Sequence, residues 1–484
     1  MSARRADRSR LVVVSNRLPV ELKREGRRWR SVPASGGLAS ALHPVLRQRG
    51  GTWFGWAGVT GPARAYARPL AQAQRAAGYR LAAVPLQERE VADFYLGFSN
   101  EVIWPLFHDL PSLCRFKVRY WETYCSVNRR YAKAVAARTQ RGDFVWVHDY
   151  HLMNLAAELR RLGVRSPLGF FLHIPFPSPD VFLKLPWRAQ IIDALLEFDL
   201  VGLQTARDRR NFLACLEALG RSARGTRIGH FPIGIDYNAF LRGAAAPQVQ
   251  ARASELHRLL PRRKLVLGVD RLDYTKGITL RLRAFQDLLE RHRGLRGRLS
   301  LIQVVVPSRE DIPQYHRMKT EIERLVGRIN GAFARPGGWV PVWYEYRSLS
   351  RLDLLAYYRA ADIALITPLK DGMNLVAKEY CACSIEEDCV LILSEFAGAA
   401  EQLGAGALLV NPYDVRGVAE ALRAAHAMPQ AERLARMRAL RRAVRREDVY
   451  RWVDAFLGAA SARRLRAAAA PAWRADAHDE PASI

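Results

Sequence analysis

The chain has 484 residues, of which 49% are hydrophobic and 25% are charged, and its formal net charge is +28. This length exceeds one ordinary hydrophobic core and predicts two or three domains. No run of eighteen apolar residues occurs, and the basic first ten residues lead into a strand without a signal segment, so we expect no membrane contact and a cytoplasmic protein.

The positive charge could indicate a nucleic-acid binder, but most of the 75 cations are arginines scattered along the whole chain. A nucleic-acid site would need a clustered basic face, so we expect no nucleic-acid partner. The six cysteines form no CxxC pair and show no zinc spacing, which favours free thiols.

Short, nearly continuous apolar runs are typical of strands in parallel sheets that are covered on both faces. In chain order they span residues 11–16, 144–149, 168–174, 200–205, 264–269, 299–306, 362–367, 389–395 and 407–412, with helical stretches between them. The sequence therefore predicts an α/β fold with two doubly wound parallel sheets.

Polar, aromatic and glycine residues follow the strands of the first half: Arg17, the glycine loop 35–42, Tyr95 and Trp104 in an aromatic loop at 94–108, and the segments HDYH (148–151) and LHIPFP (172–177). The carboxyl ends of parallel strands meet at one edge of the sheet, where ligands bind. We therefore expect a basic and aromatic crevice suited to a phosphorylated sugar.

His148, Asp149, His151 and His173 raise the question of a metal site. The spacing H-D-x-H is not that of a closed zinc site, and no cysteine stands nearby. A neutral histidine that bonds a sugar hydroxyl, and an aspartate that orders an acceptor hydroxyl, are simpler interpretations. We expect no metal.

The seam between the two halves is predicted near residues 238–262, where a loop and a Pro-Arg-Arg segment precede the strand at 264. Such seams favour ligand clefts. Near the end, residues 431–447 place Leu434, Met437, Leu440 and Val444 at helical spacing, which predicts a surface helix rather than a nucleic-acid arm. The Ala/Pro-rich tail from about residue 466 is expected to be disordered.

Two motifs of the second half indicate a nucleotide-sugar site. In GVDRLDYTKG (268–277), Arg271 and Lys276 are spaced to hold one pyrophosphate from two sides. In TPLKDGMNLVAKEY (367–380), Asp371 and Gly372 precede a helix N-terminus that can receive a phosphate or sugar, and Glu379 can accept bonds from a ribose. The glycine loops of dinucleotide oxidoreductases and P-loop NTPases are missing from the sequence.

Taken together, a series of motifs closely resembles the trehalose-6-phosphate synthases over about residues 11–455: LVVVSNRLP, SGGLASAL, GTWFGWAG, FSNEVIWPLFH, HDYHLM, GFFLHIPFPSP, FPIGID, DRLDYTKGI, TPLKDGMNLVAKEY and SEFAGAA. The resemblance implies the GT-B fold, with two Rossmann-like domains facing a cleft. It implies transfer of glucose from a nucleotide-glucose, usually UDP-glucose, to the anomeric hydroxyl of glucose 6-phosphate, with retention and without a metal or cofactor.

The resemblance also assigns site residues. The acceptor sugar phosphate would bind Arg17, Tyr95, Trp104, Arg309 and Asp149. The donor would bind Gly37, His173, Arg271, Lys276, Asp371, Gly372, Met373, Asn374, Leu375, Val376 and Glu379. The reaction would be carried by five of these residues: Asp149, His173, Arg271, Lys276 and Asp371. Asp371 would bind the glucose hydroxyls, and Glu379 would bind the ribose. The main departure from the family pattern is the Arg-rich stretch 21–34, whose role stays open.

We expect a basic extension at 1–10, an acceptor-binding domain at 11–240, a nucleotide-sugar-binding domain at 241–450, a helix at 451–465 that returns to the first domain, and a disordered tail at 466–484. We also expect a homo-oligomer with synthase activity only. The alternatives are a related synthase with another acceptor such as glycerol 3-phosphate, and a catalytically silent regulator. The donor base, UDP, ADP or GDP, stays open.

Overall fold

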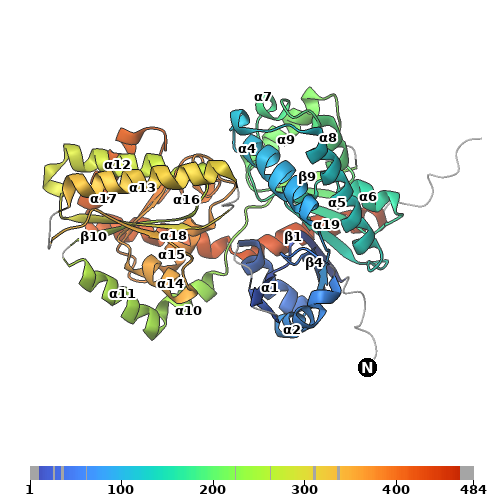
Figure 1. Cartoon of the computed structure of the whole chain (residues 1–484), viewed down its shortest axis with the longest axis horizontal. Helices are drawn as coiled ribbons and strands as arrows, with labels where there is room; N and C mark the ends of the chain where they lie inside the picture. Colours follow the sequence, from blue (N-terminus) through green and yellow to red (C-terminus); the bar gives the residue numbers. More distant parts are fainter. Residues whose placement is uncertain are drawn as a thin grey trace, which may run out of the picture.

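The computed structural model describes residues 10–25, 28–33, 37–61, 63–223, 225–261, 263–308, 312–334 and 338–468. Arg309 and nearly all of the tail predicted to be disordered lie outside these ranges. Two lobes lie side by side, one built mainly from the first half of the chain and one from the second (Figure 1). Each lobe has a parallel sheet at its centre.

The first lobe contains a seven-stranded sheet in the order β5-β4-β1-β6-β7-β8-β9. Its strands are β1 (Leu11–Arg17), β4 (Thr52–Trp56), β5 (Arg80–Ala83), β6 (Phe144–His148), β7 (Leu168–Phe171), β8 (Leu200–Leu203) and β9 (Arg227–His230). Its helices include α1 (Gly37–Arg49), α2 (Ala67–Ala77), α3 (Glu88–Glu90), η2 (Val91–Ile103), α4 (Trp104–Phe107), α5 (Val118–Ala136), α6 (Leu155–Arg161), α7 (Pro179–Phe182), α8 (Arg188–Leu195) and α9 (Ala206–Ala218).

The second lobe contains a six-stranded sheet in the order β12-β11-β10-β13-β14-β15. Its strands are β10 (Lys264–Arg271), β11 (Leu299–Val306), β12 (Val342–Tyr346), β13 (Ile363–Ile366), β14 (Val390–Ser394) and β15 (Leu408–Val410). Its helices include α10 (Tyr237–Ala245), α11 (Pro247–Leu259), α12 (Ile278–Arg291), α13 (Pro313–Phe333), α14 (Arg351–Ala360), α15 (Leu375–Cys383), α16 (Ala400–Leu403), α17 (Val415–Ala427) and α18 (Gln430–Arg446).

The central strands are buried along their length because helices cover both faces of each sheet. All five residues of β6 are buried, and β1 pairs with it in parallel register from Leu11 opposite Phe144 to Val14 opposite Val147. Their apolar, largely β-branched and aromatic side chains fit a sheet with two dry faces. This packing places the carboxyl ends of the strands at one edge of each sheet.

All nine predicted strands are present, and the predicted helix at 431–447 is confirmed as α18, with Met437, Leu440 and Val444 buried. The Arg-rich stretch 21–34 forms most of an antiparallel hairpin, β2 (Val20–Glu25) with β3 (Arg28–Pro33). Two predicted loops are wrong. The aromatic loop predicted at 94–108 is helical, since it consists of the π-helix η2 followed by α4. The loop predicted within the seam at 238–262 is also mostly helical, and its residues belong to α10 and α11.

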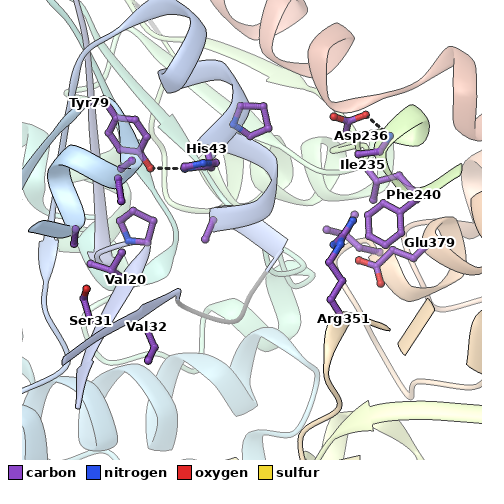
Figure 2. Close-up of a pocket in the computed structure, with 18 of the residues that line it drawn as sticks. Val20, Ser31, Val32, His43, Tyr79, Ile235, Asp236, Phe240, Arg351 and Glu379 are labelled. Atoms are coloured by element: carbon purple, nitrogen blue, oxygen red, sulfur yellow. Dashed lines mark hydrogen bonds between the residues drawn. The ribbon is translucent and has the colours of Figure 1, made fainter. Parts of the chain in front are cut away.

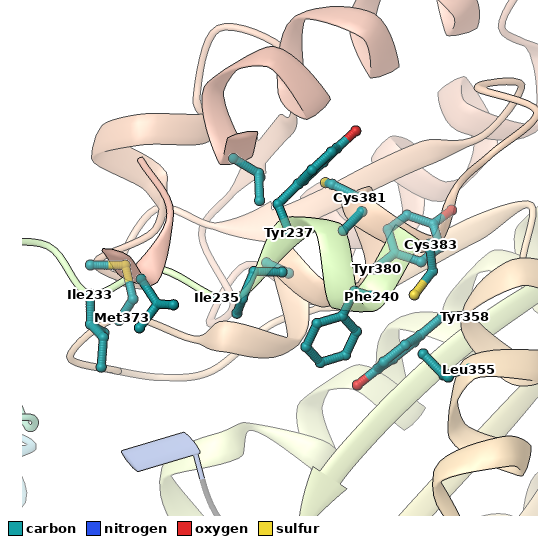
Figure 3. Packing of buried hydrophobic residues seen from close by; sticks show 14 of the residues in the cluster. Ile233, Ile235, Tyr237, Phe240, Leu355, Tyr358, Met373, Tyr380, Cys381 and Cys383 are labelled. Carbon is teal, nitrogen blue, oxygen red and sulfur yellow. The ribbon is translucent and has the colours of Figure 1, made fainter. Parts of the chain in front are cut away.

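The chain passes between the lobes twice. Residues 231–236, here called the linker, lead into α10, and the linker and α10 pack their apolar side chains against α15 (Figure 3). The last helix, α19 (Val449–Ala468), returns to the first lobe, where the Trp452 and Phe456 rings lie 5.0 Å and 4.5 Å from the ring of Trp146. Both passages tie the second lobe to the core of the first.

All six cysteines are free thiols, as predicted. Among the described residues, no helix combines the length and the apolar character that a membrane span requires.

Candidate active site

The centre of the second-lobe site is an ion pair between two turns that lie 95 positions apart in the chain. Lys276, in the turn after β10, places Nζ 2.6 Å from Oδ2 of Asp371, in the turn after β13, and the side chains are only 13% and 15% exposed. The side-chain amide of Asn374 donates to the same oxygen at 3.1 Å. Desolvation alone would raise the pKa of Asp371, but the charge and hydrogen bond of Lys276 hold the pKa below its ordinary value.

A buried arginine that was not predicted from the sequence stabilises the Lys276 turn. Arg281 in α12 is 1% exposed and ion-pairs with Asp270 of β10 at 2.5 Å. It also donates to Thr367 Oγ1 at 3.0 Å and to the backbone carbonyl of Lys276 at 3.3 Å. Because a buried charge is costly unless its bonds are satisfied, this network fixes the ends of β10 and β13 relative to each other.

Asn374 shapes the start of α15. Its φ of 78° is in the left-handed region, and its side chain caps the helix by accepting from the backbone N–H of Ala377 at 3.2 Å. Helix N-termini carry partial positive charge, so the N–H groups of Leu375 and Val376 suit an anionic or hydroxyl-rich ligand. Met373 lies just before them and is 3% exposed.

Glu379 lies farther along α15 and accepts a hydrogen bond from the hydroxyl of Tyr358 at 2.8 Å. Burial raises the pKa of its carboxyl. Together with Leu375 and Arg351 it lines a cavity of about 520 Å³, whose opposite wall comes from α1, α2 and the β2–β3 hairpin (Figure 2). The cavity adjoins the predicted donor site at Glu379 but does not include Asp371 or Lys276.

The first lobe meets the Asp371 turn through backbone contact. A Cβ built on Gly372 would lie 2.2 Å from the carbonyl oxygen of His173 and 3.0 Å from the backbone of Ile174. Only glycine allows this approach, which is one physical reason for the Asp-Gly pair in the motif. Asp371 is therefore brought next to the strand ends of the first lobe.

At these strand ends, Asp149 follows β6 and has a φ of 73°, which is unusual for a residue other than glycine. Its carboxylate accepts from the backbone N–H of His173 at 3.2 Å. Nε2 of His173 lies 3.1 Å from Nδ1 of His148. Burial lowers the pKa of His173 to about 3, so its ring is neutral at physiological pH.

Two of the predicted acceptor residues, Arg17 and Tyr95, lie together. The guanidinium of Arg17 lies over the rings of Trp56 at 4.3 Å and Tyr95 at 5.5 Å, and Tyr95 stacks on His151 at 6.0 Å. Arg17 also lies 3.7 Å from Glu21. Trp56 lies within the GTWFGWAG motif, but the sequence alone assigned it no role.

Trp104 lies at the boundary between the lobes, and its ring contacts that of Tyr150, which in turn contacts His151. Nε1 of Trp104 donates to Asp273 Oδ1 at 3.3 Å, and the Arg271 guanidinium lies 6.0 Å from the Trp104 ring. Trp104 therefore contacts the turn predicted to bind the donor pyrophosphate. A further ion pair between the lobes, Lys370 with Asp109, lies beside the Asp371 turn and was not foreseen.

Gly37 is the first residue of α1, as expected of the glycine loop, and Arg309 lies outside the described residues. In the part of the chain that the structure describes, no group of three or more His, Cys, Asp and Glu side chains is arranged to hold a metal ion.

The sequence of this chain is similar to those of known trehalose-6-phosphate synthases. A trehalose-6-phosphate synthase from Mycolicibacterium smegmatis is 44% identical over 478 residues, covering 94% of this chain and 93% of that protein. A bifunctional trehalose-6-phosphate synthase/phosphatase from Thermoproteus tenax is also 44% identical, over 93% of this chain, and the chain spans 63% of its length.

Solved structures are similar as well. A UDP-forming α,α-trehalose-phosphate synthase from Burkholderia xenovorans in complex with glucose-6-phosphate has a TM-score of 0.84 at 36% identity, covering 94% of this chain and 100% of that one. An E. coli structure bound with UDP-2-fluoro glucose has a TM-score of 0.84 at 37% identity, covering 93% and 99%. The two parallel-sheet lobes are thus those of a GT-B glycosyltransferase.

The family model for glycosyltransferase family 20 matches residues 9–462, which include every described site residue. By this match and by the 44% identity to its curated relatives, the chain belongs to glycosyltransferase family 20.

Proposed function

We propose that the protein transfers glucose from UDP-glucose to glucose 6-phosphate, forming α,α-trehalose 6-phosphate and UDP. One observation carries the proposal: the Lys276–Asp371 pair of the second lobe lies directly against the strand end of His173 and Asp149 in the first. A donor held on the second lobe can therefore present its glucose to an acceptor held on the first. Relatives solved with glucose-6-phosphate and with UDP-2-fluoro glucose support both substrates.

On the donor side, Arg271 and Lys276 bind the diphosphate, and Asp371 accepts bonds from glucose hydroxyls. The N–H groups from Gly372 to Val376 contact the donor, and Glu379 binds the ribose. As the bond between the anomeric carbon and the diphosphate breaks, negative charge grows on the diphosphate. Cations already fixed around that position lower the barrier because they need no reorganisation.

On the acceptor side, Arg17 and Tyr95 hold the sugar phosphate together with Arg309 and Trp104, and Asp149 orders the reacting hydroxyl. The acceptor oxygen forms its bond to the anomeric carbon on the face that the diphosphate leaves, and its proton passes to the departing phosphate oxygen. This route retains the α configuration and needs no side-chain nucleophile.

We further propose that residues 11–240 bind the acceptor and residues 241–450 the donor. The homo-oligomeric state and the cytoplasmic location stay predictions, and light scattering of the purified protein tests the first.

The function is tested by measuring nucleoside diphosphate release with UDP-, ADP- or GDP-glucose, each with glucose 6-phosphate, glycerol 3-phosphate or no acceptor. We expect release that requires glucose 6-phosphate, is fastest with UDP-glucose and yields a non-reducing disaccharide phosphate. Release only with glycerol 3-phosphate would keep the donor site and replace the acceptor, and no release with any pair would favour a silent regulator.

A further inference from the structure

Two histidine rings from neighbouring strand ends form a buried pair. His148 is the last residue of β6, and His173 follows β7, which pairs with β6 so that His148 lies opposite Phe171. His148 Nδ1 and His173 Nε2 are 3.1 Å apart, and His148 is 0% exposed. The backbone of His173 is held in addition by the carboxylate of Asp149, which accepts its N–H at 3.2 Å.

Both rings are neutral. Burial, and to a smaller extent the neighbouring His173, lowers the pKa of His148 well below its ordinary value, and burial lowers that of His173 to about 3. A neutral imidazole has one N–H and one acceptor nitrogen. The short contact therefore holds a single proton, carried either by Nδ1 of His148 or by Nε2 of His173.

The surroundings of His148 decide between these arrangements. Its ring packs against Trp146, with centroids 4.7 Å apart, and against Trp452 of α19 at 6.3 Å. Nε2 of His148 is buried without a hydrogen-bond partner, and so are the Nε1 atoms of both tryptophans. An indole nitrogen can only donate.

A proton on His148 Nε2 would add a third unpartnered buried donor to the N–H groups of the two indole rings that pack against the imidazole. Without a proton, Nε2 carries a lone pair and is an acceptor. Buried N–H groups without a partner are rarer in proteins than buried acceptors with an unused lone pair. The proton of His148 therefore belongs on Nδ1, from which it donates to Nε2 of His173.

We infer that His148 is a positioning residue that holds His173 in the tautomer protonated at Nδ1. Nε2 of His173 accepts the hydrogen bond from His148. The ring nitrogen of His173 that remains for a ligand is therefore Nδ1, which carries the hydrogen. His173 then meets the donor sugar as a hydrogen-bond donor to an oxygen. The contact of His173 with the sugar rests on the proposed function, whereas the tautomer does not.

The tautomer is read directly from the ¹⁵N shifts of histidine-labelled full-length protein without substrate, with the His173 signals assigned by their loss in His173→Gln. We expect His173 to be protonated at Nδ1. A His173 protonated at Nε2 overturns the inference whatever the transfer assay shows, so failure of the inference and of the proposed function can be distinguished.

Two variants separate positioning from packing. His148→Asn can place an amide N–H near the position of Nδ1, and we expect it to keep the His173 tautomer and a kcat within about threefold of the unmodified protein. His148→Leu keeps an apolar side chain but has no donor. We expect a mixed His173 tautomer and a kcat about tenfold lower, the equivalent of one hydrogen bond, with KM for glucose 6-phosphate unchanged. An unchanged tautomer in a folded Leu variant, or equal losses in both variants, would overturn the inference.

Discussion

The contact of Gly372 with the first lobe can be tested by adding a single methyl group. In Gly372→Ala the new Cβ would lie 2.2 Å from the carbonyl oxygen of His173, and the atoms next nearest to it, 3.0 Å away, belong to the backbone of Ile174. No flexible side chain can move aside, because all three of these neighbours are main-chain atoms. The two turns must therefore separate.

The size of the separation follows from the contact. Ordinary contact begins at 3.4 Å, so the Asp371 turn and the His173 strand end must move apart by about 1.2 Å. The proposed transfer takes place between groups on these two segments. A misplacement of about 1 Å typically costs on the order of 10²-fold in rate, and we expect kcat/KM to fall by roughly that factor.

The assay is UDP release with UDP-glucose and glucose 6-phosphate, accompanied by thermal unfolding of each variant. The matched control is Gly327→Ala in α13, where a Cβ meets nothing within 4 Å. We expect this control to keep full activity and to gain up to about 1 kcal/mol of stability, because alanine favours helix. If the kcat/KM of Gly372→Ala stays within threefold of that of the unmodified protein, the close approach at Gly372 does not determine the distance between the reacting groups, and the claim is refuted.

Three further predictions concern charge. Lys276→Met should leave the carboxylate of Asp371 buried without its partner and lower the free energy of unfolding by up to about 3 kcal/mol, with loss of UDP affinity. The control Lys319→Met removes a cation from a pair whose side chains are 30% and 42% exposed, and it should change stability by less than about 1 kcal/mol. Equal effects of the two variants in a denaturant titration would contradict the buried-pair argument. His173 is neutral in the folded protein, whereas in the unfolded chain it is protonated below about pH 6.5. Lowering the pH from 7.5 to 5 should therefore reduce the free energy of unfolding by about 2 kcal/mol through His173, a loss that His173→Gln should not show. Parallel pH profiles of stability for the two proteins would count against the low pKa of His173. Glu379→Gln should weaken UDP binding about tenfold or more by calorimetry, and unchanged affinity would remove Glu379 from the ribose site.

Much of the fold is readable in the sequence because central parallel strands consist of nearly continuous apolar residues. Two of the strands that were missed, β9 and β12, lie at sheet edges and have few buried residues. β12 (VWYEY) keeps only its first residue buried, and β9 (RIGH) has four residues with polar ends. Such segments carry too little apolar signal for a strand prediction.

The two predicted loops failed for different reasons. Residues 91–103 form a π-helix, whose period differs from the 3.6-residue repeat that reveals an α-helix, so the helical pattern is hidden. In 238–262, Gly243 and Pro247 suggested a loop, but Pro247 is the first residue of α11, where its missing N–H costs nothing. The alanines around them favour helix.

The local structure of the candidate site was predictable where one motif contains the whole turn and the start of the helix. The turn and the helix of residues 371–379 are adjacent in the chain, so a helix N-terminus after Asp371 and Gly372 could be predicted, whereas the Asn374 cap was not. Pairings between distant segments were not predictable. Nothing in the local sequence shows that Lys276 pairs with Asp371, that Trp56 stacks on Arg17, or that buried Arg281 holds the Lys276 turn, because each depends on how the strands are ordered in the sheets.

The two lobes divide the electrostatic work of the proposed reaction. The turn after β10, proposed to bind the donor, carries Lys276 and Arg271. The first-lobe strand ends that face it carry neutral histidines, kept uncharged by burial, and the carboxylate of Asp149. A charged imidazole at His173 would add a second positive centre on the sugar side and repel the positive charge that develops at the anomeric carbon when the diphosphate leaves. A neutral ring that donates one hydrogen bond can hold the sugar without that cost, and the positive potential stays concentrated on the diphosphate. In the proposed reaction, burial of the histidine pair would therefore have an electrostatic role in addition to its packing role.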